Sequence, residues 1–311
     1  MRVLFMGTGV FAVPSLNALI GSRHDVLAIV TQPDRPAGRG REVRMSAIKS
    51  MGLIAGLPIL QPEKVRDEGF VWEVESLAPD VIVVASFGQI IPKSILGIPK
   101  YGNVNVHGSL LPKYRGAAPV HYALFDGKPF TGVTTMLMSP GLDTGPILLR
   151  QEEPILPGDN QASLEERLAE IGAGLLLETL DRLEAGTITP EAQDEARATY
   201  SPSIKREDCR INWEDSANSI VNRVRGCTPR PGAYTMWQGT PLKIWVCREE
   251  TESPLLPEGP GTVHSVTSEG ILVDAAQGTV LLTEVQPENR KRMSATDFAR
   301  GYHIVSGSLF T

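Results

Sequence analysis

The sequence predicts an α/β fold in its first two thirds, built on a doubly wound, parallel-type sheet, and a smaller C-terminal β-barrel domain. In the first part, short continuous apolar runs alternate with segments of helical apolar spacing, which is typical of a parallel sheet with helices on both faces. The second part changes to short strand-like runs separated by Gly and Pro, which favours a small barrel. With 311 residues, 41% of them hydrophobic, the chain is long enough for both cores.

Four apolar runs in the first part are the expected strands, because each is short and continuous, as in strands buried on both faces. They cover residues 3–6, 26–30, 81–85 and 104–107. Helical spacing predicts a helix over 65–77 and a long one over 163–185. Ser163 and Glu166 form a capping-box pattern at the start of the long helix, and Gly186 follows its end.

The second part follows a polar segment without a clear period, which indicates a linker. Beyond it we expect a helix over 216–225 and strands over 242–246, 262–266, 271–273 and 279–284. We therefore place a first domain at residues 1–188, a linker at 189–207 and a second domain at 208–311.

Composition argues against several classes of protein. The net charge is −6, and neither part is basic, so general polyanion binding is not the first expectation. Cys209, Cys227 and Cys247 are odd in number and lack metal-ligand spacing, which indicates free thiols in a reducing cytoplasm and no metal site. The apolar run at the start is too short for a signal peptide, and no window reaches the about 20 apolar residues of a membrane span.

A glycine-rich turn follows the first expected strand. The segment Gly7–Ala12 fits the dinucleotide-binding pattern G-x-G-x-x-[GA], so a nicotinamide-dependent dehydrogenase is one alternative. That interpretation requires an acidic residue near the end of the second strand, about 20 residues on. The strand ends near Val30, and Asp34 comes later, beside Pro33. A tight strand-to-helix turn without a nucleotide accounts for the same glycines.

A polar pair marks the end of the fourth expected strand. Asn105 and His107 are two residues apart and therefore point to the same face, and Gly108 lets the chain turn. An Asn amide can donate to a developing oxyanion, and a His can transfer protons near neutral pH. Asp143, in a glycine-framed turn, is a third candidate that would orient His107. A structural His and a turn-forming Asp are the alternatives.

At these residues the sequence resembles the formyltransferase family that uses 10-formyltetrahydrofolate. The resemblance covers nearly the whole chain, and its motifs occur in order. They are Thr31–Gly40, Asn105–Pro112, Tyr114–Pro119, Gly132–Thr134, Gly141–Gly145, Ile211–Trp213 and Pro229–Ala233. The resemblance implies that the first domain is catalytic, with Asn105, His107 and Asp143 as the catalytic trio. It also implies that the second domain is an OB-like barrel that contacts tRNA.

The resemblance further implies a co-substrate, 10-formyltetrahydrofolate, bound in a cleft of the first domain, and no metal. One loop of the family contacts the folate, and a nearby strand-to-loop segment walls the pterin pocket. The residues that fall on these two segments are Ser109, Leu110, Leu111 and Pro112, and Phe87, Gly88 and Ile90.

The implied acceptor is the α-amino group of methionine on initiator tRNA, formylated for translation initiation. The basic loop at 35–41 is expected to reach the acceptor stem. The candidate tRNA contacts are Arg35, Arg39, Arg41, Arg230 and Lys291, with Arg223, Arg225, Arg290 and Arg292 as further basic residues of the second domain. Nothing in the sequence demands more than a monomer. Two alternatives remain: a relative that formylates another amine, such as a glycinamide or a nucleotide-linked sugar, and a non-catalytic RNA-binding protein.

Overall fold

The computed structural model describes residues 1–37, 42–250 and 259–311, which form two compact units. The first unit comprises Met1–Pro119, Phe130–Pro154 and Glu165–Ser201. The second comprises Val120–Pro129, Ile155–Leu164 and Pro202–Thr311. Two short segments from the middle of the sequence therefore pack with the C-terminal part of the chain.

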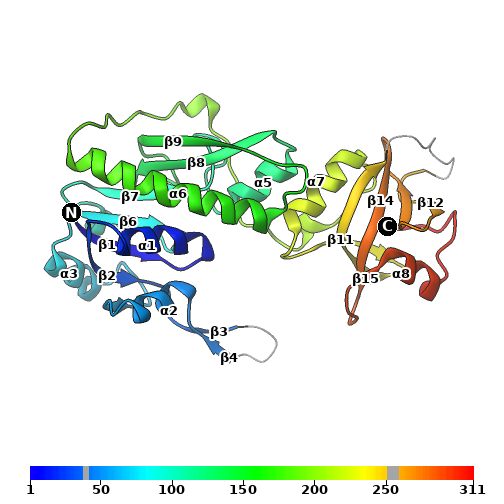
Figure 1. The fold of residues 1–311 in the computed structure, drawn as a ribbon, viewed down its shortest axis with the longest axis horizontal. Coiled ribbons are helices and arrows are strands. Elements are labelled where there is room, and N and C mark those ends of the chain that lie inside the picture. The colour runs from blue at the N-terminus through cyan, green and yellow to red at the C-terminus, as the bar shows by residue number, and fades with distance from the viewer. Residues whose placement is uncertain (38–41, 251–258) are drawn as a thin grey trace. The chain divides into compact units, whose positions relative to one another are not determined.

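A seven-stranded sheet with the order β5-β2-β1-β6-β7-β8-β9 forms the centre of the first unit (Figure 1). Its strands are β1 (Arg2–Gly7), β2 (Asp25–Val30), β5 (Ile59–Leu60), β6 (Val81–Ala85), β7 (Asn103–His107), β8 (Phe130–Leu137) and β9 (Ile147–Pro154). The strands from β5 to β7 are parallel, whereas β8 and β9 are antiparallel to their neighbours. The four predicted strands are confirmed. Strands β8 and β9 pair antiparallel to each other because the residues between Leu137 and Ile147 are too few for a parallel crossover.

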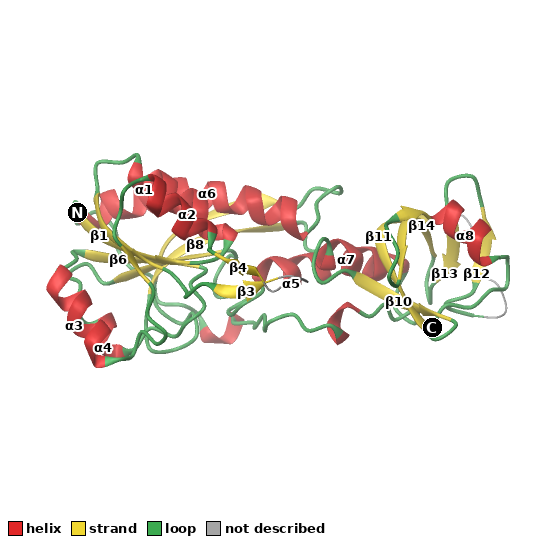
Figure 2. Ribbon diagram, turned by 90° about the horizontal axis from the view of Figure 1, so that it is seen from below, coloured by secondary structure: helices red, strands yellow, loops and turns green. Residues whose placement is uncertain are grey.

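Helices cover both faces of this sheet, which confirms the predicted α/β class. Figure 2 shows α1 (Val13–Ile20), α2 (Ala47–Ile54) and α6 (Gln161–Glu184) on one face. The other face carries α3 (Glu68–Leu77) and α4 (Lys93–Leu96). The predicted helix at 65–77 therefore begins three residues later than expected. None of the helices in the described ranges is long and apolar enough to span a bilayer.

The long helix α6 begins two residues before the predicted Ser163. The side chain of Asn160 accepts hydrogen bonds from the N–H groups of Ala162 and Ser163, at 3.0 and 3.2 Å, and thus caps the helix. Asn is as good an N-cap as Ser, and it comes first along the chain. The expected end is confirmed, because Gly186 has φ +66°, a left-handed conformation typical of a helix C-terminus.

The second unit contains an antiparallel sheet with the order β10-β11-β14-β13-β12, and β15 pairs with β14. Its strands are β10 (Ala233–Trp237), β11 (Thr240–Glu250), β12 (Val263–Val266), β13 (Ile271–Asp274), β14 (Thr279–Pro287) and β15 (Met293–Ser294). Helices α7 (Ala217–Cys227) and α8 (Ala295–Tyr302) pack on the same core. The free thiols Cys209 and Cys227 are buried in that core. The sequence predicted a small β-barrel here, and the structure confirms a C-terminal β-domain, whose sheet is antiparallel. Strands β10 and β15 and helix α8 were not predicted.

The remaining elements are short. They are the 3₁₀ helices η1 (Val10–Ala12), η2 (Glu195–Arg197) and η3 (Glu207–Cys209), the hairpin of β3 (Arg35–Ala37) with β4 (Glu42–Arg44), and helix α5 (Pro119–Phe125).

Candidate active site

The carboxyl end of β7 carries the two polar side chains that the sequence singles out. In the pairing with β8, Asn105 lies opposite Met136 and His107 opposite Thr134. Both side chains are nearly buried, at 9% and 6% exposed. Polar groups this deep in a sheet need partners, because an unpaired buried polar group costs about 1–3 kcal/mol.

The ring of His107 is fixed from one side by a backbone carbonyl. Its Nε2 lies 2.9 Å from the carbonyl oxygen of Tyr114. A carbonyl oxygen only accepts, so Nε2 carries the proton and donates. The other ring nitrogen, Nδ1, lies 3.7 Å from the carboxylate oxygen Oδ2 of Asp143. His107 therefore presents Nδ1, together with the Asp143 carboxylate, as the pair available for proton transfer.

Asp143 occupies a strained position in the β8–β9 connection. Its φ is +51°, in the left-handed region that non-glycine residues seldom adopt. Its Oδ2 accepts a hydrogen bond of 2.8 Å from the N–H of Gly116. The structure thus places Asp143 next to His107, and Asn105 lies on β7 together with His107. All three predicted residues belong to the first unit.

Gly116 has no room for a side chain. Its φ is +118°, and a Cβ there would lie 2.8 Å from the carbonyl oxygen of Ser201. We expect Gly116→Ala to destabilise the protein by about 2 kcal/mol or more, since both backbone strain and a clash must be relieved. It would also displace the N–H group that donates to the Asp143 carboxylate, so we expect kcat to fall together with Tm. Gly174→Ala, at an exposed helical position with open space, is the control that keeps kcat and does not lower Tm. Wild-type Tm and kcat in Gly116→Ala would contradict this description of the turn.

The loop that follows β7 is held by internal hydrogen bonds. Ser109 is fully buried, and its hydroxyl donates to the carbonyl of Lys113 at 2.7 Å. The hydroxyl of Thr134 donates to the carbonyl of Ser109 at 2.7 Å and accepts from the N–H of Leu111 at 3.1 Å. The Leu111 side chain is buried, whereas Leu110 and Pro112 are half-buried. A ligand at this loop would meet Leu110, Pro112 and backbone atoms.

A second loop follows β6 and has open space beside it. Phe87 is buried in the core of the first unit, so it can offer only its backbone to a ligand. Gly88 has φ +83°, and a Cβ there would have only the Nε2 atom of Gln32 nearby, at 3.8 Å. Ile90 is 91% exposed. The exposed apolar side chain of Ile90 and the open space at Gly88 suit the flat faces of the pterin ring that the sequence resemblance implies.

The glycine turn after β1 has a packing role. A Cβ on Gly7 would lie 2.7 Å from the ring of Phe5, and one on Gly9 would lie 2.3 Å from the hydroxyl of Ser86. The N–H groups of Thr8 and Gly9 both donate to the carbonyl of Ser86 at 3.1 Å. These amides bond to the protein itself, so the turn is explained by close packing of β1 against β6 rather than by a dinucleotide.

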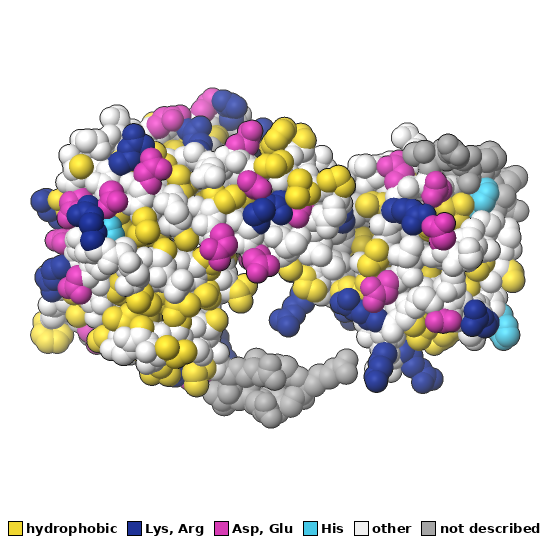
Figure 3. Space-filling model, in the orientation of Figure 1, with side chains coloured by type: hydrophobic (Ala, Val, Ile, Leu, Met, Phe, Trp, Pro, Cys, Tyr) yellow, Lys and Arg dark blue, Asp and Glu magenta, His cyan; other side chains and the backbone are white. Residues whose placement is uncertain are grey.

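The basic residues predicted to contact tRNA divide between described and undescribed parts of the chain. Arg39 and Arg41 lie outside the described residues, and Arg35 is exposed on β3. Arg230 and Lys291 are both exposed. Figure 3 shows Lys and Arg side chains projecting at the lower edge of the C-terminal unit.

Two other arginines of the second unit have internal partners. Arg225 donates to the carbonyls of Leu156 and Pro157 at 3.2 and 3.3 Å, and burial lowers the pKa of its guanidinium. Arg223 lies 5.5 Å from the ring centre of Phe125 and donates to the carbonyl of Asp208. Their bonds hold the second unit together, so neither is a good candidate for a phosphate contact.

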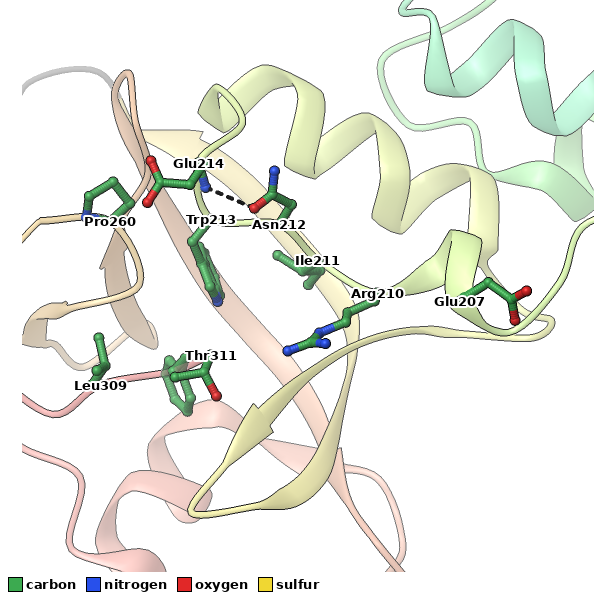
Figure 4. A pocket seen from close by; sticks show the side chains of 10 residues that line it. Glu207, Arg210, Ile211, Asn212, Trp213, Glu214, Pro260, Leu309 and Thr311 are labelled. Carbon is green, nitrogen blue, oxygen red and sulfur yellow. Dashed lines mark hydrogen bonds between the residues drawn. The ribbon is translucent and has the colours of Figure 1, made fainter.

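A cavity of about 530 Å³ lies in the second unit (Figure 4). Arg210 lies at its edge, and the rings of Trp213 and Phe310 stack at 6.3 Å beside it. Both rings are nearly buried, at 5% and 1% exposed. They therefore belong to the core and are not a platform for a ligand, and none of the catalytic candidates lines this cavity.

The sequence alone did not predict the residues that hold His107 and Asp143 in place. Tyr114 and Gly116 belong to the Tyr114–Pro119 motif. That motif supports the family resemblance, but the sequence assigned its residues no role in the site. Gln193 and Ser201 lie in the polar segment that was predicted to be a linker, where no pattern distinguishes them. Ser201 is fully buried, and its hydroxyl donates to the carbonyl of Tyr114 at 3.0 Å.

Comparison with known proteins agrees with this geometry. Residues 1–180 match the formyl transferase family, and residues 203–303 match the formyl transferase C-terminal domain. The methionyl-tRNA formyltransferase of Geotalea uraniireducens (strain Rf4) is 47% identical over 310 residues, covering 99% of this chain and 97% of its own. That of Bacillus subtilis (strain 168) is 46% identical over 309 residues, with coverage of 99% and 97%.

Solved structures share the fold at lower identity. The sugar 3N-formyl transferase WlaRD, determined with dTDP and 5-N-formyl-THF, superimposes with a TM-score of 0.68 at 18% identity, covering 94% of this chain and 99% of its own. HypX from Aquifex aeolicus in complex with tetrahydrofolic acid superimposes with a TM-score of 0.65 at 19% identity, and the match covers 96% of this chain and 47% of HypX. The full-length relatives are far more similar, and the chain belongs to the formyl transferase family, among the methionyl-tRNA formyltransferases.

Proposed function

We propose that this chain transfers the formyl group of 10-formyltetrahydrofolate to the α-amino group of methionyl initiator tRNA, giving N-formylmethionyl-tRNA and tetrahydrofolate for translation initiation. The observation that carries the proposal is the identity of 45–47% to methionyl-tRNA formyltransferases along 98–99% of the chain. This similarity includes the second unit as well as the first.

Folate binding is proposed at the two loops that follow β6 and β7. Gly88 and Ile90 follow β6, and the half-buried Leu110 and Pro112 follow β7, so both loops leave the carboxyl edge of neighbouring parallel strands, where Asn105 and His107 also lie. Two structural relatives were determined with tetrahydrofolic acid and with 5-N-formyl-THF, which supports this choice of ligand. The bound folate supplies an activated formyl carbon on N10.

The three catalytic residues then have distinct roles. The amine attacks the formyl carbon, and the side-chain N–H of Asn105 donates to the formyl oxygen as it gains negative charge. His107 already donates through Nε2, so its free Nδ1 takes the proton that the attacking nitrogen releases. The carboxylate of Asp143, 3.7 Å away, stabilises the resulting imidazolium. The same proton then passes to N10 as the carbon–N10 bond breaks, which returns His107 to its starting form.

Transfer RNA binding is proposed to involve Arg35, Arg39, Arg41, Arg230 and Lys291. If about four of these contact phosphates, kcat/KM for methionyl-tRNA should fall roughly 10²-fold between 50 and 200 mM salt. Steady-state rates across that range measure the effect, and the KM for folate is the internal control that stays nearly constant. A flat salt dependence for tRNA would contradict phosphate contacts by these residues.

A panel of acceptors tests the proposal itself. The protein is incubated with 10-formyltetrahydrofolate and, separately, methionyl initiator tRNA, free methionine, glycinamide ribonucleotide and a dTDP-linked amino sugar. We expect rapid formylation of the tRNA alone. Faster formylation of any of the small amines would overturn the proposed acceptor while leaving the family assignment intact.

A further inference from the structure

The segment 191–201 lies along the loop that supports His107. Arg115 and Tyr200 form a parallel bridge. The N–H of Arg115 donates to the carbonyl of Thr199 at 2.8 Å, and the N–H of Ser201 donates to the carbonyl of Arg115 at 2.7 Å. The N–H of Tyr114 donates to the hydroxyl of Thr199 at 2.8 Å. The loop that accepts the Nε2–H of His107 is therefore paired with this segment as one strand is with another.

Within this segment, Gln193 bridges two parts of the site. Its Nε2 donates to the carbonyl oxygens of Asp143 and Gly145, both at 2.7 Å. Its Oε1 accepts from the Nε and Nη2 atoms of Arg115, at 3.1 and 2.9 Å. A side-chain amide has two donor hydrogens and two acceptor positions, so this one is fully used. Its orientation is thereby fixed, with the N–H groups on the Asp143 turn.

Arg115 anchors Gln193 from the other side. Its side chain is 0% exposed, and its guanidinium donates to both carboxylate oxygens of Glu195, at 2.8 and 2.7 Å. A buried charge is costly without a partner, so this bidentate pair holds the guanidinium in one place. The hydrogen bond from Arg115 also keeps the pKa of the Glu195 carboxyl below its usual range, so the pair stays ionised at neutral pH.

The Asp143 turn needs such an anchor. A non-glycine residue in the left-handed region is strained, and this conformation persists only where the surroundings over-determine it. A shift of this turn would carry the Asp143 carboxylate away from Nδ1 of His107, 3.7 Å away. We infer that Gln193, held by Arg115, is a positioning residue for formyl transfer, because it fixes the turn that places Asp143 opposite His107. The inference rests on the proposed role of Asp143 and assigns no substrate contact to Gln193.

The test substitutes Gln193 in two ways. Gln193→Glu keeps the size and the acceptor for Arg115 but sets a carboxylate oxygen against two backbone carbonyls. Gln193→Met keeps the length and removes all four hydrogen bonds. We expect kcat to fall about 10²-fold in both, with the KM for folate and for tRNA within two-fold of wild type. Asp194→Asn, a neighbouring exposed residue that caps η2, is the matched control with wild-type kcat. An unchanged kcat, or a raised KM at constant kcat, would overturn the inference.

A spectroscopic measurement tests this inference independently of the proposed function. It needs only one of the two Gln193 variants to be folded. In protein labelled with ¹⁵N at histidine, the His107 signals are assigned by their loss in His107→Ala. In whichever Gln193 variant is folded, we expect the Nδ1 resonance to move, since its carboxylate neighbour moves, while Nε2 stays bonded to Tyr114. An unmoved Nδ1 resonance would overturn the positioning role. Absence of formyl transfer by the wild type would instead overturn the proposed function and leave the resonance test valid.

Discussion

His107→Ala is expected to lower kcat for formylation about 10³-fold and to leave the affinity for folate unchanged. The variant loses the nitrogen proposed to take the amine proton and later return it, and loss of a proton-transfer group typically costs about 10²–10⁴ in rate. Its fold should survive. The carbonyl of Tyr114 that His107 occupies still accepts a hydrogen bond from Ser201, so the loop keeps a partner. The lost hydrogen bond should reduce the free energy of unfolding by only about 1 kcal/mol.

Two measurements decide this prediction. Single-turnover formylation at saturating substrate gives the chemical rate, and folate fluorescence quenching gives the binding constant. His303→Asn is the control, because His303 is exposed and Asn tolerates its left-handed φ of +55°. A rate within ten-fold of wild type would remove His107 from the mechanism. An equal loss of folate affinity would make its role one of binding.

Asp143→Asn is expected to lower kcat about 10³–10⁴-fold, comparable to the loss when the carboxylate of a catalytic triad becomes an amide. Asn tolerates the left-handed φ of +51°, and its carbonyl can still accept from Gly116, so the turn should keep its shape. The oxygen that accepts from Gly116, Oδ2, is also the one that lies 3.7 Å from Nδ1 of His107, so an uncharged amide oxygen would take its place there. The substitution therefore keeps the geometry of the turn and removes the charge that stabilises the imidazolium.

The measurement for Asp143 compares Asn with Ala. Ala adds strain at the left-handed position, so Asp143→Ala should lower Tm as well as kcat, whereas Asp143→Asn should lower kcat alone. Circular dichroism and single-turnover rates give the two quantities. Substantial activity in Asp143→Asn would mean that Asp143 acts only as a turn residue, which was the alternative that the sequence left open.

The pairing of Asn105 with His107 follows from sequence because strand alternation is a local rule. The parallel strands were predictable for the same reason, since each is a short apolar run. The closeness of Asp143 to His107 is a tertiary fact, and 36 residues separate the two. The sequence offered Asp143 only as a candidate to orient His107, the family resemblance made it one of a trio, and the structure gives the distance.

Other features could not be predicted because they depend on long-range partners. Gln193 looks like any polar residue of a linker until its amide is seen between Arg115 and the Asp143 turn. Arg225 appeared to be a free basic residue, yet its guanidinium bonds to carbonyls of a segment nearly 70 residues away. The start of α6 was misplaced because two good caps, Asn160 and Ser163, stand three residues apart, and either satisfies the local rule.

The central claim is that the trio moves a formyl group from folate to the methionyl amine of a tRNA. It is tested most directly by following the label of 10-[¹⁴C]formyltetrahydrofolate in the presence of methionyl initiator tRNA. We predict that one label per aminoacylated tRNA is recovered as N-formylmethionine after mild hydrolysis, with one tetrahydrofolate formed for each. Label that remains on folate, or that appears as free formate without formylmethionine, would contradict the account.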